Sequence, residues 1–174
     1  MNYQPEPYVE VMIDIETTGL EPSTSGIWQV GLVTSKGLAF KVTINPQGLP
    51  SETNTIKWQE TANRDNWEDA QTINPEYSMQ DMLVLLIEHI LHIREKHSKL
   101  RFWSKGEFDF RHLSYHLKAQ KIAVPWKYWE LNDLRTLTNV FDIPKFSGGH
   151  SALRDARMQL DVLMTLLAKV EKVK

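Results

Sequence analysis

The sequence predicts an α/β domain with a mixed sheet flanked by helices. An apolar run at residues 9–15 is followed by two runs of strand composition, 27–34 and 37–44, joined by a short Ser-Lys-Gly link. Such a short link is typical of an antiparallel meander. The polar segment 45–77 predicts only short helices, and a buried strand is expected at 100–103. The predicted elements begin with strands and continue with a strand and helices in alternation. This order favours a mixed sheet covered by helices.

The helix with the strongest signal spans residues 78–97. Ser78 and Asp81 have the spacing of a capping box, and the apolar residues that follow recur at helical intervals. Three further helices are expected, at 107–121, 132–141 and 150–173. Asn132 or Asp133 would serve as the N-cap of the second of these.

Composition and length indicate one globular domain spanning residues 1–174. The net charge of −2 gives no overall basic field of the kind that attracts nucleic acid. The chain has no cysteine, which excludes disulfides and cysteine-bound zinc and suits a reducing cytoplasm. The first ten residues lack the pattern of a secretion signal. The longest apolar stretch, 82–93, contains charged residues and is too short for a bilayer, so no membrane partner is expected.

A pair of carboxylates in the first strand carries the functional prediction. Alternation places Asp14 and Glu16 on one face of the strand, at the edge of a core. Neighbouring carboxylates in that position repel each other and lose hydration, so they normally need a cation. Asp109 follows the strand 100–103, and such strand ends favour ligand sites.

The last helix supplies two further candidates. His150 lies in its entry turn, and Asp155 lies about one and a half turns further along. The chain therefore offers four acids and one histidine on three separate elements. Because oxygen ligands predominate and cysteine is absent, the set suits Mg²⁺ or Mn²⁺.

The motifs resemble those of a known superfamily. DIETTGL at 14–20, FD at 108–109 after a strand, and His-x-x-x-x-Asp at 150–155 are similar to the three motifs of the DEDDh 3′–5′ exonucleases. That superfamily has a ribonuclease H-like fold, and the match spans residues 11 to about 165. Segments such as TIKWQETANRD and GGHSALRDARMQ look most similar to phage-type exonuclease A and its bacterial exoribonuclease relatives. Each motif alone is weak, whereas the ordered set is specific.

The resemblance implies a two-metal mechanism that releases nucleoside 5′-monophosphates from single-stranded 3′ ends. Asp14 would bridge both ions, and Glu16 and Asp155 would complete the site of the nucleophile-side ion. Asp109 would support the second ion through water. His150 would accept the proton of the attacking water, a task that suits an imidazole.

The resemblance also implies contacts to the substrate. Thr17 and Thr18 would lie beside the terminal nucleotide and Leu20 against its base, with Trp28 as a weaker stacking candidate. Lys105 stands four residues before the middle Asp, where many relatives have an Asn that contacts the substrate backbone.

A basic stretch runs from residue 94 to 127, with nine Lys or Arg against three Asp or Glu. Phe102, Trp103 and Tyr115 are interleaved with it, so the stretch could hold the phosphates of a single strand. A solvated face is the alternative, and Trp103, in a predicted buried strand, favours the core.

The candidate residues also have ordinary structural interpretations. Asp14 and Glu16 would be strand-end surface acids, Asp109 a helix cap, His150 a helix-start residue, and Asp155 a partner of Arg154 or Arg157. Asp133 is favoured as a helix cap over a catalytic residue. The remaining histidines are placed on helix faces and none is expected to be a ligand: His89, His92, His97, His112 and His116.

The leading hypothesis is a metal-dependent 3′–5′ exonuclease with a slight preference for DNA. The alternatives are an exoribonuclease, a proofreading subunit docked on a polymerase, and a non-catalytic nucleic-acid-binding accessory module. Discrimination between DNA and RNA depends on a group that reads the 2′-OH, which the sequence does not identify. A homodimer through helices 78–97 and 151–172 is a further possibility, and neither the preferred ion nor the substrate length is fixed.

Overall fold

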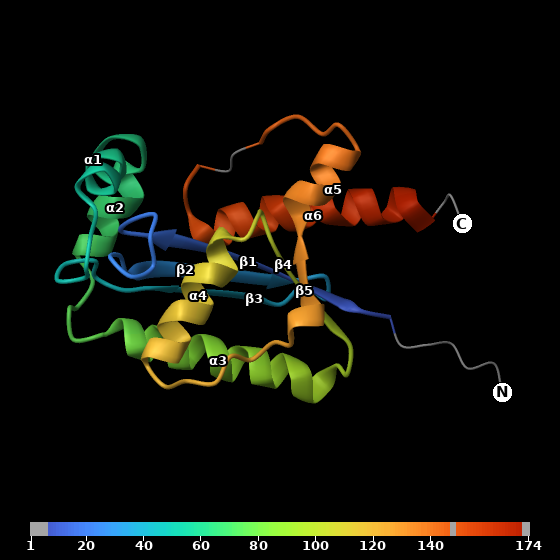
Figure 1. Ribbon diagram of the computed structural model, residues 1–174, viewed down its shortest axis with the longest axis horizontal. Helices are drawn as coiled ribbons and strands as arrows, with labels where there is room; N and C mark the ends of the chain where they lie inside the picture. Colours follow the sequence, from blue (N-terminus) through green and yellow to red (C-terminus); the bar gives the residue numbers. More distant parts are fainter. Residues whose placement is uncertain (1–6, 147–148, 172–174) are drawn as a thin grey trace.

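The computed structural model describes residues 7–146 and 149–171, which form a mixed five-stranded sheet with helices on both faces (Figure 1). The strand order is β3-β2-β1-β4-β5. The strands are β1 (Val9–Thr17), β2 (Ile27–Thr34), β3 (Ala39–Thr43), β4 (Leu100–Ser104) and β5 (Leu131–Asp133). The first three form an antiparallel meander, and β4 and β5 continue the sheet in parallel from β1. The predicted mixed sheet is confirmed.

The helices follow the predicted order, and the polar segment 45–77 contains two short helices, as predicted. They are α1 (Thr53–Ala62), α2 (Arg64–Gln71), α3 (Met79–Lys96), α4 (Phe108–Ala119), α5 (Leu134–Val140) and α6 (Ala152–Glu171), with a 3₁₀ turn at Tyr128–Glu130. The capping box of Ser78 and Asp81 is confirmed. Asp133, rather than Asn132, caps α5, since its side chain accepts a hydrogen bond from the backbone N–H of Arg135.

Two helix boundaries differ from the prediction. The strand β5 includes residues 132 and 133, where the sequence predicted the start of a helix. A strand of three residues is too short to show alternation, so its pattern merges with that of α5. The last helix begins at Ala152, two residues later than predicted, and its predicted end at 172–173 lies outside the described residues.

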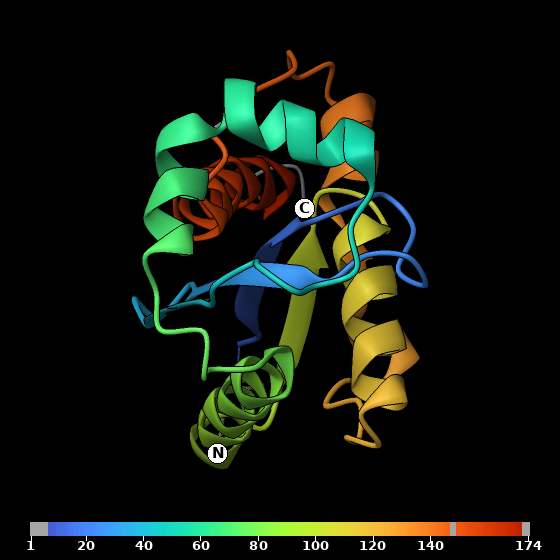
Figure 2. The same cartoon turned by 90° about the vertical axis from the view of Figure 1, so that its left-hand side faces the viewer.

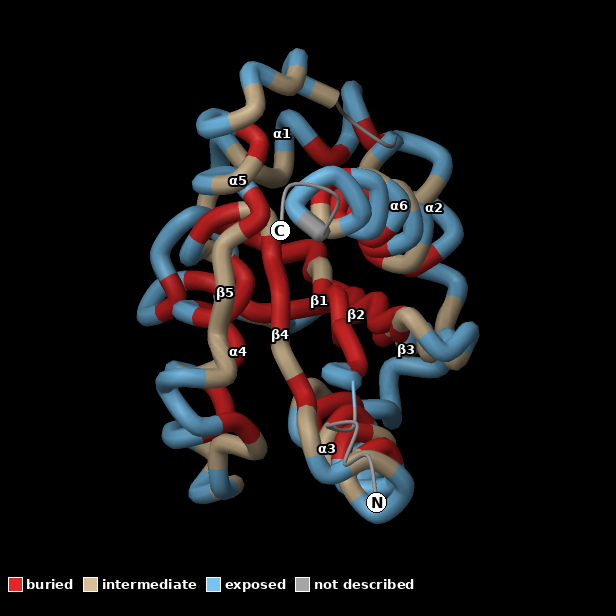
Figure 3. The backbone as a smooth tube through the Cα atoms, turned by 90° about the vertical axis from the view of Figure 1, so that its right-hand side faces the viewer, coloured by how far each residue is buried: buried red, intermediate tan, exposed pale blue. Residues whose placement is uncertain are grey.

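Two apolar layers pack against opposite faces of the sheet, with α3 on one side and α6 on the other (Figure 3). On β1, alternation sends Val11, Ile13 and Ile15 into the layer formed with α3 and α4. Met12 packs into the opposite layer, formed with α5 and α6. The even-numbered positions of β1 therefore face α6.

Three aromatic residues do not have the surface roles that the sequence suggested. Trp28 is fully buried and its indole N–H donates to the carbonyl of Thr17, so its prediction as a stacking residue is wrong. Phe102 and Trp103 are also buried, which leaves Tyr115 exposed within the basic stretch. The alternative that placed Trp103 in the core is confirmed.

The start of α6 passes unusually close to β2. A Cβ atom on Gly31 would lie 2.3 Å from the backbone of Ala152 and Leu153, so the approach requires a glycine. Gln29 fixes the contact further, because its Oε1 accepts from the backbone N–H of Ala152 at 2.8 Å. Gly31 is the register partner of Asp14 on β1. This packing therefore brings the first turn of α6 over the carboxylates of β1.

Among the described residues, no helix combines the length and the apolar character that crossing a membrane requires.

Candidate metal centre

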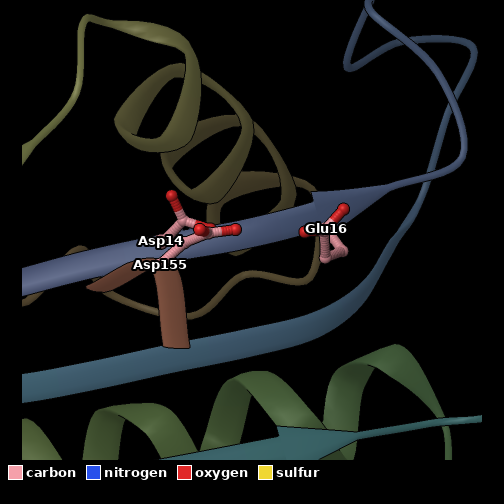
Figure 4. Close-up of side chains that lie close together, drawn as sticks. All are labelled: Asp14, Glu16 and Asp155. Carbon is pink, nitrogen blue, oxygen red and sulfur yellow. The ribbon is translucent and has the colours of Figure 1, made fainter. Parts of the chain in front are cut away.

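Three carboxylates in the described part of the chain gather where β1 meets the first turn of α6 (Figure 4). Asp14 and Glu16 extend from β1, and Asp155 extends from α6. One oxygen atom from each lies within 4.8 Å of the others. Such a group of carboxylate oxygens is suited to a hard divalent cation.

Asp109 joins the same cavity from the first turn of α4. Its carboxylate is buried, and Oδ1 accepts a hydrogen bond from the backbone N–H of Ile15 at 3.1 Å. The cavity has a volume of about 300 Å³ and is also lined by Asp14, Glu16 and Asp155. We call it the metal cavity. The structure thus brings the four predicted acids together, with Asp109 beside the three-oxygen group rather than within it.

Burial raises the pKa values of Asp14, Glu16 and Asp109, and repulsion by neighbouring acids adds to this effect at Asp14 and Glu16. Burial, followed by the charges of Asp109 and Glu16, raises the pKa of Asp14 well above its ordinary value. Burial and the charge of Asp155 raise the pKa of Glu16 to about 8. Burial raises the pKa of Asp109 to about 7. Carboxylates that resist ionisation together bind a divalent cation with release of protons, so the residues present fit a metal site.

Two glutamines that the sequence analysis missed orient the acids. Gln159 is buried on α6, and its Nε2 donates to Asp14 Oδ1 at 2.7 Å. Gln59 on α1 donates to the carbonyl of Thr17 at 3.1 Å, and its hydrogen bond to Glu16 lowers the pKa of that acid. The spacing of four residues between Asp155 and Gln159 places both on one helix face, and that spacing was the available signal.

His150 lies in the wall of the same cavity, in the turn that precedes α6. Its backbone has a positive φ of 59°, and its carbonyl accepts from Asn66 Nδ2 at 2.7 Å. Asn66 in turn accepts from Gln29 Nε2 at 3.1 Å. The imidazole meets the ring of Trp58 edge to face, with centroids 4.6 Å apart. His150 is therefore held at its backbone and at its ring by the α1–α2 pair, which lies beside the start of α6 (Figure 2).

A second cavity of about 430 Å³ adjoins the first. Its lining residues are Ile15, Glu16, Thr17, Leu20, Asn54, Thr55, Trp58, Gln59 and Phe108. Leu20 and Trp58 are both exposed and give it apolar walls. We call it the terminal cavity.

Only some of the residues predicted to contact the substrate line the terminal cavity. Thr17 and Leu20 line the terminal cavity, whereas the side chain of Thr18 is fully buried. The Thr18 hydroxyl bonds to the carbonyls of Gly26 and Pro50, so it stabilises the loop instead of facing the cavity. Trp58 lies in the segment TIKWQETANRD, which resembles known exonucleases, but the sequence assigned the residue no role of its own.

Lys105 lines the metal cavity, where its Nζ donates to the carbonyl of Phe146 at 2.6 Å. Two other cations of the predicted basic stretch form ion pairs. Arg94 pairs with Glu130, and Arg101 pairs with Glu10, so both have structural partners.

The remaining histidines stay outside the metal cavity, whose lining includes His150 but none of His89, His92, His97, His112 and His116. His112 and His116 are buried on α4. Burial lowers the pKa of His116 to about 4.

A family model described as the 3′-5′ exoribonuclease Rv2179c-like domain matches residues 9–167. No curated protein matches the chain. Among solved structures, E. coli exonuclease I in complex with a dT13 oligonucleotide has a TM-score of 0.66 at 13% identity, covering 94% of this chain and 41% of that chain. An apo exonuclease I has a TM-score of 0.59 at 14% identity, covering 95% of this chain and 42% of that chain. The chain thus spans about two fifths of these proteins and shares their ribonuclease H-like fold.

Proposed function

The chain belongs to the family of 3′-5′ exoribonuclease Rv2179c-like domains, a group of DEDD-type 3′–5′ exonucleases, and from this premise we propose that it shortens single-stranded nucleic acid from the 3′ end. Residues 1–174 would act as one exonuclease domain. The observation that carries the proposal is the convergence of four acids from β1, α4 and α6 on one cavity, with His150 in its wall. The products would be nucleoside 5′-monophosphates.

The proposed metal site holds two divalent ions, Mg²⁺ or Mn²⁺. Asp14, Glu16 and Asp155 would bind one ion, and Asp14 with Asp109 would bind the second. Ions bound there supply an activated water and stabilise the charge on the leaving oxygen. Gln159 keeps the Asp14 carboxylate in place, because its hydrogen bond restricts the rotation of that side chain.

The proposed general base is His150. A neutral imidazole accepts a proton at physiological pH and returns it to solvent readily. His150 lines the same cavity as the acids, which is compatible with a water molecule between them. The contacts from Trp58 and Asn66 restrict both its ring and its backbone, which favours a fixed orientation for proton transfer.

The terminal cavity would receive the last nucleotide. Leu20, Trp58 and Phe108 offer apolar surface for the base, and the volume is within the range of small-molecule pockets. Asn54 and Thr55 offer polar groups that could bond to the sugar or to the edge of the base.

The family description concerns RNA, and it moves the proposal from the slight preference for DNA towards RNA. Two of the matching exonuclease I structures are complexes with single-stranded DNA, but at 13% identity the likeness shows the fold alone. The cytoplasmic location and the homodimer remain predictions. For the dimer, α3 offers exposed apolar side chains at Val84, Leu85 and Leu91.

The test uses 5′-labelled single-stranded RNA and DNA of equal sequence, incubated with Mg²⁺, Mn²⁺ or EDTA. We expect a ladder that shortens from the 3′ end, faster on RNA, and that disappears with EDTA and in the Asp14→Ala variant. Cleavage that survives the substitution would assign it to a contaminating nuclease. No cleavage of either strand with metal present would overturn the proposal and favour the non-catalytic accessory module.

A further inference from the structure

A third cavity, of about 650 Å³, adjoins the metal cavity. Its lining residues are Lys105, Arg135, Thr138, Asn139, Ile143, Pro144, Lys145 and Phe146. It shares Lys105, Arg135 and Phe146 with the metal cavity, but it shares no lining residue with the terminal cavity. We call it the α5 cavity, since much of its wall comes from α5 and the loop that follows.

The three cavities therefore occur in a fixed order. The terminal cavity shares Ile15, Glu16 and Phe108 with the metal cavity, which are residues of β1 and α4. The α5 cavity shares a different set, so the metal cavity lies between the other two. A strand whose last nucleotide occupies the terminal cavity would place its scissile phosphate at the acids. Its preceding nucleotides would then continue towards the α5 cavity.

The sign of the charge changes between the metal cavity and the α5 cavity. Four carboxylates line the former and outnumber the two cations, Lys105 and Arg135, that both cavities share. The described residues that line the α5 cavity include the cations Lys105, Arg135 and Lys145 and no carboxylate. A phosphodiester away from the ions needs cationic side chains to neutralise it, and the α5 cavity supplies them.

Two of the cations of the α5 cavity, Lys105 and Arg135, interact with each other. Arg135 Nη2 donates to the carbonyl of Lys105 at 3.0 Å, and the Lys105 ammonium lies over the Phe146 ring at 4.1 Å. Partial burial and the neighbouring charge of Arg135 lower the pKa of Lys105. Two cations in such proximity repel each other, so an anion between them would relieve that repulsion.

We propose that the α5 cavity is the subsite for the phosphodiester that precedes the scissile one in a single-stranded substrate, with Lys145 as its outermost contact. The strand then enters over α5, crosses the metal cavity and ends in the terminal cavity. This inference rests on the proposed function for the direction of the strand. The affinity of the α5 cavity for a phosphate backbone is a separate property that binding alone can measure.

A groove of about 610 Å³ beside α4 and β5 is the competing path for the strand. It contains the cations Arg111 and Lys118, but Glu107 and Asp133 balance them. It shares no lining residue with the metal cavity. Because its charges cancel and it does not open directly on the acids, it is the less suitable path. Lys118 provides a matched control for Lys145, since both are exposed lysines.

The test measures binding without cleavage. A 5′-fluorescein-labelled uridylate 12-mer and its thymidylate equivalent are titrated in EDTA at several salt concentrations, using the wild type, Lys145→Gln and Lys118→Gln. We expect Lys145→Gln to weaken binding by roughly two- to fivefold. It should also reduce the slope of log Kd against log salt by about 0.7, the value for one contact to a single strand. Lys118→Gln should leave both quantities unchanged.

Kinetics with short substrates add an independent readout. A dinucleotide without a 5′-phosphate has only the scissile phosphodiester, whereas a trinucleotide has one phosphodiester before it. Lys145→Gln should raise the ratio of the trinucleotide KM to the dinucleotide KM, and a general structural defect would raise both KM values together.

The outcomes separate the two proposals. If Lys145→Gln leaves the salt slope unchanged, or if Lys118→Gln is the variant that reduces it, the subsite is wrong. If the wild type cleaves neither strand with Mg²⁺ or Mn²⁺, but Lys145→Gln still reduces the salt slope, the exonuclease proposal fails and the backbone-binding subsite stands.

Discussion

The two ends of β1 carry buried carboxylates on the same face, but their surroundings differ. At the beginning of the strand, Glu10 pairs with Arg101 and accepts from the indole N–H of Trp103 at 2.6 Å. At its end, Asp14 and Glu16 face other acids, and burial with the charge of Asp155 raises the pKa of Glu16 to about 8. The protein gives the first end an ion-pair partner, whereas at the second end Lys105 and Arg135 only line the same cavity as the acids. The divalent ion that we propose would balance the remaining charge there.

This difference separates structural from functional acids better than burial does. Glu10 and Glu16 are 3% and 8% exposed, so their burial alone does not distinguish them. A buried carboxylate that lacks a protein cation costs stability, and such a cost is typical of a site maintained for binding or catalysis. Substitutions at the two ends should therefore have opposite effects.

The largest expected effect is on activity at the end of β1. Asp14→Asn keeps the side-chain volume and removes one carboxylate, so we expect a loss of kcat/KM of about a thousandfold. The same change removes like-charge repulsion, so stability in EDTA should be unchanged or higher. Nuclease assays and thermal melts on one preparation test both halves. An inactive variant that also melts at a lower temperature would contradict the comparison.

The next largest effect is on the pH dependence of stability, measured with and without a divalent ion. An acid whose pKa rises on folding contributes stability below its unfolded pKa and loses that contribution as the pH rises through its folded pKa. For Glu16 the unfolded pKa is 4.5 and the folded pKa is about 8, so stability in EDTA should fall as the pH rises between these two values. A bound divalent ion at a hundred times its Kd adds about 2.7 kcal/mol. The melting temperature should therefore fall from pH 5 to pH 8 in EDTA and fall less with Mg²⁺. Equal pH profiles in the two conditions would argue against a metal site.

At the beginning of β1 the effect should be on stability. Glu10→Gln leaves the Arg101 guanidinium without its carboxylate, which we expect to cost about 2 kcal/mol. Arg101 retains some exposure to solvent, and this keeps the cost below that of a fully buried pair. Urea denaturation measures the loss, and activity at low temperature should stay within about threefold of the wild type. A large loss of activity in the folded variant would show that the two ends are coupled.

The functional side of this contrast could be predicted from the sequence, whereas the pairing of Glu10 with Arg101 could not. Alternation placed Asp14 and Glu16 on one face, and the ordered motifs indicated Asp109, His150 and Asp155. The sequence did not predict what holds them. Asn66 and His150 are 84 residues apart, and a single hydrogen bond over that distance leaves no periodic pattern. For Trp28 the sequence suggested a stacking role that the structure does not support. Its burial depends on packing, which the residue type does not reveal.

The smallest expected effect is on kcat at Trp58, a residue to which the sequence assigned no role. Trp58 contacts the His150 ring and also lines the terminal cavity, so it touches both the proposed base and the proposed nucleotide site. Trp58→Ala should lower kcat by about tenfold, and Trp58→Phe should restore most of it because an aromatic edge still meets the imidazole. A residue that only packs would change stability without changing kcat. If alanine and phenylalanine variants share the same kcat, the ring contact does not orient His150, and Asn66 alone holds it.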